Sequence, residues 1–421
     1  MSIVLDVIKP RRLEPVVRGL MMDEPVIVLT GPRTVGKSTL LRCLAHDHGV
    51  DVIDLDDTTT RRLVAQDLAL FVAGHPPVMI DEFQHIPEIL DAIKAELNRD
   101  TRPGHFLLTG PTRYSTLPRT AQSLTGRVHV VTVWPLSQGE ITGTVETFLT
   151  TLLADDSPTV PTALSRTSRE QYVERVLAGG LPAVLRRRPG RPRARWYEDY
   201  LNLVVERDVL DIRNIHQGAV LPEFLRTIAA QTGQILNIAQ AARGSGIKAA
   251  LGEDYLRLLE AVFLVHRIPA WGITLGARVN KLPKIHLVDS GLGGWLLGLT
   301  ERALSRRLPA AMTEFGHLLE TFAVNELLKQ ASWIDESLRC GHYRTSDGHE
   351  VDLVVEHHDG RCFAIEIKAG ASYRPEDLRG LTRLRDKLGD AFTCGVLLYL
   401  GERGALVDDR LYVLPLDRLW S

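Results

Sequence analysis

The sequence predicts an α/β protein in which a parallel sheet with helices on both faces is followed by a helical middle and a second α/β part. Short apolar runs alternate with helical patterns through the first 135 residues, which is typical of parallel strands covered by helices. Mainly helical patterns follow to about residue 300, and strand-like runs return in the last third. A chain of 421 residues also exceeds what one hydrophobic core usually organises, so we expect two or three domains.

Five short runs predict the strands of the first sheet. They are short and mainly apolar, and the first is also β-branched, as buried parallel strands are. The run VIVLT at 26–30 is followed by a Gly-rich turn and a helix from Lys37 to about Ala45, and IPEILDAIKAELNRD predicts a later helix. The other four runs are VDVIDL at 50–55, PVMID at 77–81, HFLLTG at 105–110 and VHVVTV at 128–133.

The middle of the chain begins with a change in composition. Between about Gly143 and Ser168, Thr, Ser, Asp and Pro are frequent, which marks a long loop or a domain edge. The stretch RRRPGRPRAR at 186–195 is too charged for a core, so we expect a solvated, flexible linker or a segment that follows nucleic-acid phosphates. Three helical patterns between Pro222 and Leu299, followed by PKIHLVD, predict a small helical or winged-helix module.

The last third predicts an α/β unit. It opens with the helical pattern FGHLLETFAVNELLKQ, and three strand-like runs then surround the charged helical segment DLRGLTRLRDKLG. These runs are EVDLVVE, CFAIEIK and CGVLLYL. The expected segments are a nucleotide-binding core at 1–150, a helical lid or linker at 151–215, a winged-helix-like module at 216–300 and the C-terminal α/β domain at 301–421.

The composition is that of an ordinary globular protein. The 50 Lys and Arg residues nearly balance the 52 Asp and Glu residues, so the net charge of −2 gives no global attraction to nucleic acid or anionic lipid. Four cysteines, at 43, 340, 362 and 394, lack the spacing of a metal site or a disulfide framework. The sequence has no secretory segment and no run of about 18 apolar residues, so we expect a cytoplasmic location without a membrane partner.

The eight residues GPRTVGKS at 31–38 match the pattern G-x-x-x-x-G-K-[ST] between a predicted strand and a predicted helix. The two glycines let backbone N–H groups approach phosphates, and the helix N-terminus adds a favourable dipole. We expect Lys37 to reach the β- and γ-phosphates and Ser38 to hold Mg²⁺. The residues expected to bind the nucleotide are Gly31, Pro32, Arg33, Thr34, Val35, Gly36, Lys37, Ser38 and Thr39.

The run VMIDE at 78–82 is an apolar strand that ends in two carboxylates. Asp81 is expected to position the Mg²⁺ shell, and Glu82 to polarise the attacking water. Thr109, or alternatively Thr112, follows the next strand and could orient that water. An ordinary capping role for the threonine stays open beside this one.

Hydrolysis at such a site needs an added positive charge in the transition state, often from a neighbouring subunit. Arg127, in SLTGRV before a strand, is the first candidate, and Arg113 and Arg207 come after it. An ordinary surface role is the alternative for each of them. Supply from a neighbour would imply a homo-oligomer with nucleotide sites at its subunit interfaces.

A second group of polar residues lies in the last third. Glu320 falls on the predicted helix, Asp352 in EVDLVVE, and Glu366 and Lys368 in AIEIK, where residues two apart share one strand face. The three carboxylates would suit Mg²⁺ or Mn²⁺, and Lys368 could orient or deprotonate water for attack on a phosphodiester. An ordinary ion pair between Glu366 and Lys368 on an exposed strand is the alternative.

Together these motifs resemble bacterial and archaeal AAA-type (AAA+) ATPases that carry a winged-helix-like segment and a C-terminal domain of obscure function with a PD-(D/E)xK nuclease-like core. The resemblance covers nearly the whole chain. Its marks are GPRTVGKST, DLDD, VMIDEFQ, LTGP, SLTGR, WPLSQGE, GGLP, ERD, YLRLLEAVFLV, PKIHLVDSGL, LLETF and the pair GHEVDLVVE and AIEIKAG.

The resemblance implies ATP as the nucleotide, dependence on Mg²⁺ and a nuclease-like C-terminal fold. Two features depart from the family's pattern. Pro111 stands where the family tends to place a Ser, which puts the role of the preceding threonine in doubt. The helical pattern GIKAALGEDYLRLLE carries three acidic residues against two basic ones, and such a helix is poorly suited to contact phosphates.

Two interpretations of different class follow. In the first, the chain is a Mg²⁺-dependent ATPase that acts on nucleic acid, with DNA as a partner of the arginine stretch and the C-terminal carboxylates. In the second, it is a nucleotide-dependent switch whose C-terminal domain mediates interactions without cleavage. The intact Glu366 and Lys368 favour the first, whereas the balanced charge and the acidic helix favour the second.

Overall fold

A computed structural model gives the fold of the chain. It describes residue 5 and residues 7–110, 124, 126–154, 164–205, 220–274, 278 and 281–421. Four residues discussed above lie outside this described part: Pro111, Thr112, Arg113 and Arg207.

The first sheet has five parallel strands in the order β2-β3-β4-β1-β5. The five predicted strands are confirmed, each with its ends trimmed by at most two residues, and β4 lies between β1 and β3. Their bounds are Val26–Thr30 for β1, Val52–Asp54 for β2, Val78–Asp81 for β3, Phe106–Thr109 for β4 and Val128–Thr132 for β5.

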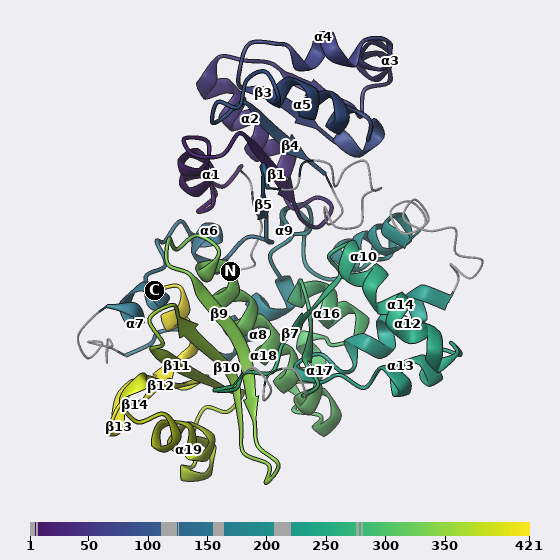
Figure 1. Ribbon diagram of the computed structural model, residues 1–421. Helices are drawn as coiled ribbons and strands as arrows, with labels where there is room; N and C mark the ends of the chain where they lie inside the picture. Colours follow the sequence, from purple (N-terminus) through teal and green to yellow (C-terminus); the bar gives the residue numbers. More distant parts are fainter. Residues whose placement is uncertain are drawn as a thin grey trace.

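Helices cover both faces of this sheet, as predicted (Figure 1). Successive strand residues point to opposite faces, so Ile27 of β1 lies in one apolar cluster and Val28 in another. The first cluster includes residues of α1 and α2, and the second includes residues of α3, α4 and α5. These helices span Glu14–Leu20, Lys37–His48, Thr58–Gln66, Leu68–Val72 and Ile89–Leu97.

Helix α2 is three residues longer than its apolar pattern predicts. It ends at His48 because Gly49 adopts the left-handed conformation, with φ of 66°, and donates its N–H back to the last turn. Three short helices follow the sheet: α6 at Gln138–Thr142, α7 at Phe148–Leu153 and α8 at Arg169–Ala178.

The expectation that 186–195 forms a flexible linker is wrong. Its second half is the first turn of α10, Arg191–Leu203, which follows the short helix α9, Pro182–Leu185. The aromatic residues that come next explain this, because Tyr197 and Tyr200 are buried in an apolar core and fix the helix. Arg193 is itself buried and donates from Nε to the carbonyl of Arg187 at 3.0 Å.

The three helical patterns of the middle are confirmed. They form α12 (Leu221–Ala229), α13 (Ile238–Gly244) and α14 (Ala249–Ala261). The run PKIHLVD supplies β8, Lys284–Leu287, the central strand of a small sheet with β6 (Gln234–Ile235) and β7 (Val265–Ile268), neither of which the sequence patterns predicted. Two short helices end this part, α16 at Ser290–Leu296 and α17 at Glu301–Ser305.

The C-terminal part begins with α18, Pro309–Ala331, and continues as a six-stranded mixed sheet in the order β13-β14-β12-β11-β10-β9. The three predicted runs are β10 (Glu350–His357), β11 (Cys362–Lys368) and β12 (Phe392–Tyr399), and the charged helical segment is α19 (Arg379–Leu388). The remaining strands are β9 at Leu338–Arg344, β13 at Ala405–Asp408 and β14 at Leu411–Pro415.

The hydrophobic cores run across the expected segment borders. Phe148 of α7 and Tyr172 of α8 share one core with α18 and the C-terminal sheet, although they precede residue 301 by far in the sequence. In Figure 1 the first sheet with its helices forms the upper part, and the middle and C-terminal parts form the broader lower part. Among the described helices, none combines the length and apolar character needed to span a membrane.

Candidate functional site

The loop 31–36 joins β1 to α2 and needs its glycines. Gly31 has φ of 145° and Gly36 has φ of 103°, a region that side chains with a Cβ rarely adopt. A Cβ at Gly31 would also collide with the carbonyl oxygen of Val133. The predicted nucleotide residues are therefore contiguous in space: Gly31, Pro32, Arg33, Thr34, Val35 and Gly36 form the loop, and Lys37, Ser38 and Thr39 open the helix.

Lys37 is buried against this loop. Its Nζ donates to the carbonyl oxygens of Gly31 and Pro32, each at 2.9 Å, and its exposed fraction is 5%. The ammonium is thus held beside the backbone of the phosphate-binding loop pattern.

The carboxyl ends of β3 and β4 bring the next predicted residues beside α2. Asp81 is buried, and its Oδ1 accepts from Ser38 Oγ at 3.1 Å and from Thr109 Oγ1. The backbone N–H of Glu82 donates to Thr109 Oγ1 at 3.2 Å, and Gln84 Nε2 donates to the Glu82 carboxylate. Thr109 therefore links the two acidic residues.

Glu82 has a left-handed backbone with φ of 55°, which is uncommon for a residue other than glycine. This conformation turns the chain directly after β3, so that Glu82 follows Asp81 at the same edge of the sheet.

Arg127 lies at the opposite edge of the sheet from this site. It precedes β5, whose first residue pairs with Val26 at the start of β1, whereas the loop follows the end of β1. Its Nη1 donates to Asn98 Oδ1 at 2.8 Å. The structure therefore does not bring Arg127 to the loop of its own chain, and the other two candidates lie outside the described residues.

Arg11 contacts the loop, although no sequence motif marked it. Its Nη1 donates to the carbonyl of Val35 at 2.9 Å, its Nη2 to the carbonyl of Trp134 at 2.6 Å, and its Nε to Glu140 Oε1 at 3.0 Å. One guanidinium thus joins the loop, the segment after β5 and α6.

The contacts continue from α6 to α18. The backbone N–H of Gln138 donates to Glu326 Oε2 at 2.8 Å. Lys329 Nζ donates to the carbonyl of Leu136 at 3.0 Å and to Glu326 Oε1 at 2.6 Å. Through Arg11 and the backbone of 134–140, the loop 31–36 and the long helix of the C-terminal part are therefore connected by a series of buried and part-buried polar contacts.

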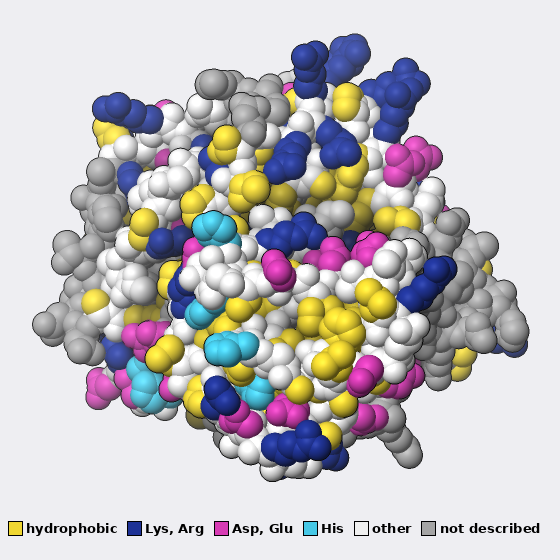
Figure 2. Space-filling view, turned by 90° about the horizontal axis from the view of Figure 1, so that it is seen from above, with side chains coloured by type: hydrophobic (Ala, Val, Ile, Leu, Met, Phe, Trp, Pro, Cys, Tyr) yellow, Lys and Arg dark blue, Asp and Glu magenta, His cyan; other side chains and the backbone are white. Residues whose placement is uncertain are grey.

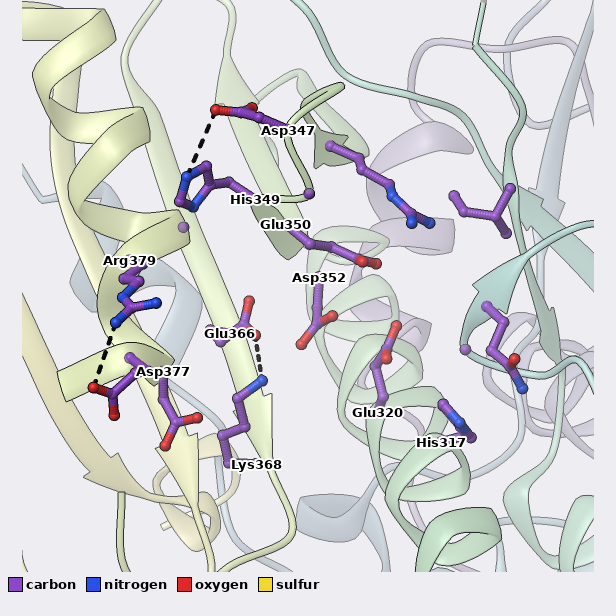
Figure 3. A pocket seen from close by; sticks show the side chains of 17 residues that line it. His317, Glu320, Asp347, His349, Glu350, Asp352, Glu366, Lys368, Asp377 and Arg379 are labelled. Atoms are coloured by element: carbon purple, nitrogen blue, oxygen red, sulfur yellow. Dashed lines mark hydrogen bonds and ion pairs between the residues drawn. The ribbon is translucent and has the colours of Figure 1, made fainter. Parts of the chain in front are cut away.

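The second predicted group also comes together in space. Glu320 of α18, Asp352 of β10 and Glu366 and Lys368 of β11 line one pocket of about 700 Å³. Figure 3 shows Asp352 between Glu320 and Glu366, with the ion pair of Glu366 and Lys368 facing the same hollow. That pair is 2.6 Å long, and Asp352 Oδ2 accepts from the N–H of Ile367 at 2.8 Å.

Lys284, which the sequence patterns did not single out, enters this group from β8. Its Nζ lies 2.7 Å from Glu320 Oε1, 2.7 Å from Glu350 Oε1 and 2.9 Å from Asp352 Oδ1. Within the described part of the chain, no group of three or more His, Cys, Asp or Glu side chains is arranged to hold a metal ion.

Burial and charge shift the protonation of this cluster. Burial would lower the pKa of Lys284, but the three carboxylates outweigh it and hold that pKa well above its usual value. Burial, followed by the charge of Asp352, raises the pKa of Glu366 to about 8. Burial acts to raise the pKa of Asp352, yet Lys284 and Lys368 lower it overall.

His342 of β9, beside this cluster, gives a testable pH dependence. Burial lowers its pKa from 6.5 to about 4, so the unfolded chain binds more protons between these values and stability falls as the pH falls. Replacing His342 with Gln should reduce this slope by up to about 1.4 kcal/mol per pH unit in urea unfolding. The exposed control His46→Gln should leave the slope unchanged. Equal slopes in all three proteins would contradict the shift.

Comparisons with known proteins agree with the first part of this description. A family model described as an AAA domain matches residues 23–142, which include the loop 31–38 and the acidic pair. Residues 23–142 form a P-loop ATPase domain of the AAA type. Two family models, each described as a domain of unknown function, match the rest: DUF8612 at 169–303 and DUF4143 at 315–419. They leave the predicted nuclease-like character of the C-terminal part unconfirmed.

Whole-chain relatives add little about function. The uncharacterized proteins Rv2008c of Mycobacterium tuberculosis and Mb2031c of Mycobacterium bovis are each 25% identical over 403 residues, which is 96% of this chain and 82% of theirs. The Walker-type ATPase PABY2304 of Pyrococcus abyssi is 16% identical with a TM-score of 0.43, over 70% of this chain and 97% of its own. The RuvB Holliday junction branch migration motor of Thermotoga maritima is 18% identical with a TM-score of 0.28, over 61% and 85%. At these TM-scores neither structure carries an argument about this chain.

Proposed function

We propose that this chain is a Mg²⁺-dependent ATPase that works as a nucleotide-dependent switch, in which the AAA-type domain controls the C-terminal part. The observation that carries the proposal is the set of three Arg11 contacts, because they tie the backbone of the P-loop to α6 and through it to α18. In this proposal, a change in the loop on nucleotide binding stretches or breaks these part-buried contacts.

The residues of the P-loop divide the work of hydrolysis in this proposal. Lys37 leaves the carbonyls of Gly31 and Pro32 to contact the β- and γ-phosphates. Ser38 and Asp81 supply the oxygen ligands that suit Mg²⁺, and their side chains already lie within 3.1 Å of one another. Bound Mg²⁺ would neutralise charge on the phosphates.

The attacking water is assigned to the end of β3. Glu82 polarises it, and Thr109 fixes the backbone of Glu82 and the carboxylate of Asp81. Since Arg127 lies at the far edge of its own sheet, an Arg127 finger requires a second copy of the chain. A homo-oligomer with nucleotide sites shared between subunits is therefore part of the proposal. We also keep the division of the chain into four functional segments with borders near residues 150, 215 and 300.

The Arg11→Ala variant tests the switch. In the wild-type protein a non-hydrolysed ATP analogue should change hydrogen exchange both in the loop and in α18, Pro309–Ala331. In the variant, at saturating analogue, the change in the loop should stay and the change in α18 should be largely lost, because its connection to the loop is cut. Arg18→Ala is the matched control, since Arg18 bonds only to Glu14 and Asp47 among the contacts described for it. An undiminished response of α18 in Arg11→Ala would rule out this route.

Action on nucleic acid is the second candidate function. It is supported by the common pocket of Glu320, Asp352, Glu366 and Lys368, which would match the helix, Asp and Glu-x-Lys order of nuclease-like folds. In Figure 2, basic side chains gather toward the upper edge of the face drawn there, whereas the acidic ones lie mostly across its middle and lower parts. DNA-stimulated ATP turnover, and Mg²⁺- or Mn²⁺-dependent cleavage that Lys368→Ala abolishes, are its expected results. If DNA does not change the rate of ATP turnover and no cleavage occurs with either metal ion, action on nucleic acid is ruled out and the switch remains as the proposed function.

A further inference from the structure

Lys284 lies in the small sheet of the middle part, but its ammonium group forms ion pairs with carboxylates of the C-terminal part. It belongs to β8, the central strand of the small three-stranded sheet, whereas its partners belong to α18 and β10. Its side chain is 1% exposed, and its ammonium lies 2.7–2.9 Å from oxygens of Glu320, Glu350 and Asp352. The charged end of Lys284 is thus held at the centre of three carboxylates.

The surroundings of this ammonium are those of a cation site. Three carboxylate oxygens converge on one point, and hard divalent cations such as Mg²⁺ and Mn²⁺ take oxygen ligands of this kind. Among the described residues, four carboxyl groups, including Glu366, make their ion pairs with the two ammonium groups of Lys284 and Lys368. The cluster therefore contains more carboxyl groups than are needed to pair each ammonium group with one of them.

Glu366 provides an independent sign of a ligand position. Its side chain is more than nine-tenths buried, and its Oε2 has no hydrogen-bond partner among the described residues, while Oε1 accepts from Lys368. The same residue lines the pocket that Glu320 and Asp352 also line, and Figure 3 shows the three carboxylates around one hollow. An unpartnered buried oxygen is costly, and a ligand in that hollow would satisfy it.

We propose that Lys284, by holding Glu320 and Asp352, blocks a divalent-cation site that these two carboxylates would form with Glu366, and that the site takes Mg²⁺ or Mn²⁺ only when Lys284 is withdrawn. Glu320 and Asp352 both accept from Lys284 in the present conformation, and the described residues form no three-carboxylate metal arrangement. The inference deepens the second candidate function: a metal-dependent step in this pocket would require β8 to move first.

The position of β8 makes such control physically reasonable. Asn325 of α18 donates to the carbonyls of Leu287 and Val288, at 2.9 and 3.2 Å, three and four residues after Lys284 in the chain. The neighbouring Glu326 of the same helix ends the polar chain from the P-loop. A shift of α18 would therefore act on the strand that holds Lys284 and on Glu320 together.

The test is the number of Mn²⁺ ions bound by the full chain, measured by electron paramagnetic resonance without nucleotide or DNA. Lys284→Met keeps most of the side-chain volume and removes the charge, and it should bind one more Mn²⁺ per chain than the wild type. Adding Glu366→Gln to this variant should remove the extra ion. Lys281→Met, which removes an exposed lysine three residues earlier, should bind as the wild type does.

If Lys284→Met folds poorly, the melting temperature measured with and without Mn²⁺ replaces the count of bound ions as the test. Mn²⁺ that binds the native state raises the melting temperature by mass action, so it should stabilise this variant and not the Lys281→Met control. The proposal is overturned if Lys284→Met gains no Mn²⁺ and no stabilisation, or if the wild type binds Mn²⁺ at this pocket equally well. Because no ATP or DNA is present, these results are separate from those that test the switch or cleavage.

Discussion

The Glu82→Gln variant is expected to bind ATP and Mg²⁺ while its hydrolysis rate falls by about 10²- to 10⁴-fold, the range of a lost general base. Glutamine has the size and hydrogen-bonding reach of glutamate, so the backbone contact with Thr109 and the left-handed turn after β3 are retained. Only the charge that polarises water is lost. The result is measured as steady-state phosphate release beside ATP binding on the same preparation.

Glu88→Gln is the matched control for this variant. It makes the same chemical change six residues later, on an exposed side chain before α5, and should hydrolyse ATP as the wild type does. If Glu82→Gln keeps most of the wild-type rate, the water must be activated elsewhere, and the assignment of Glu82 is wrong.

The Lys37→Ala variant should lose ATP hydrolysis by about 10²- to 10³-fold or more, as expected when a group that stabilises charge in the transition state is removed. Unlike Glu82→Gln, it should also weaken ATP binding, because Lys37 contacts the phosphates in the ground state too. Both effects are measured by titrating ATP and following phosphate release.

The stability of Lys37→Ala needs its own check, since Lys37 bonds to the carbonyls of Gly31 and Pro32. Lys94→Ala, on the exposed side of α5, is the matched control and should change neither binding nor rate. A Lys37→Ala protein that melts like the wild type and still binds and hydrolyses ATP would contradict the assignment.

The AAA-type domain could be predicted from the sequence because its signals are local. The strand before the loop, the two glycines and the helix that starts at Lys37 lie within about twenty residues, so one short stretch of sequence carries the whole pattern. Buried parallel strands also have a distinctive composition, so all five strands of the first sheet were found in place.

The residues that the sequence did not reveal act over long separations. Arg11 bonds to Glu140 across 129 positions, and Lys284 bonds to Asp352 across 68. Neither contact leaves a periodic pattern or a motif, because a single lysine or arginine next to a proline is common on surfaces. Only the packing of the three parts onto one another brings these side chains to their partners.

The arginine stretch at 186–195 shows a different reason for error. Its charge and its prolines predicted a solvated linker, but proline is favourable in the first turn of a helix, and Pro192 occupies that turn in α10. The aromatic residues after it then supply the buried face. Tertiary packing of a few large side chains outweighed the composition of the preceding stretch.

The most direct test of the account is phosphate release from ATP by the purified wild-type chain, with Mg²⁺ and again with excess EDTA, beside the double variant Ser38→Ala and Asp81→Asn. The account predicts hydrolysis that needs Mg²⁺ and is lost in the double variant, because these two residues hold the ion beside the phosphates. Hydrolysis that continues in EDTA, or an unchanged rate in the double variant, would contradict it.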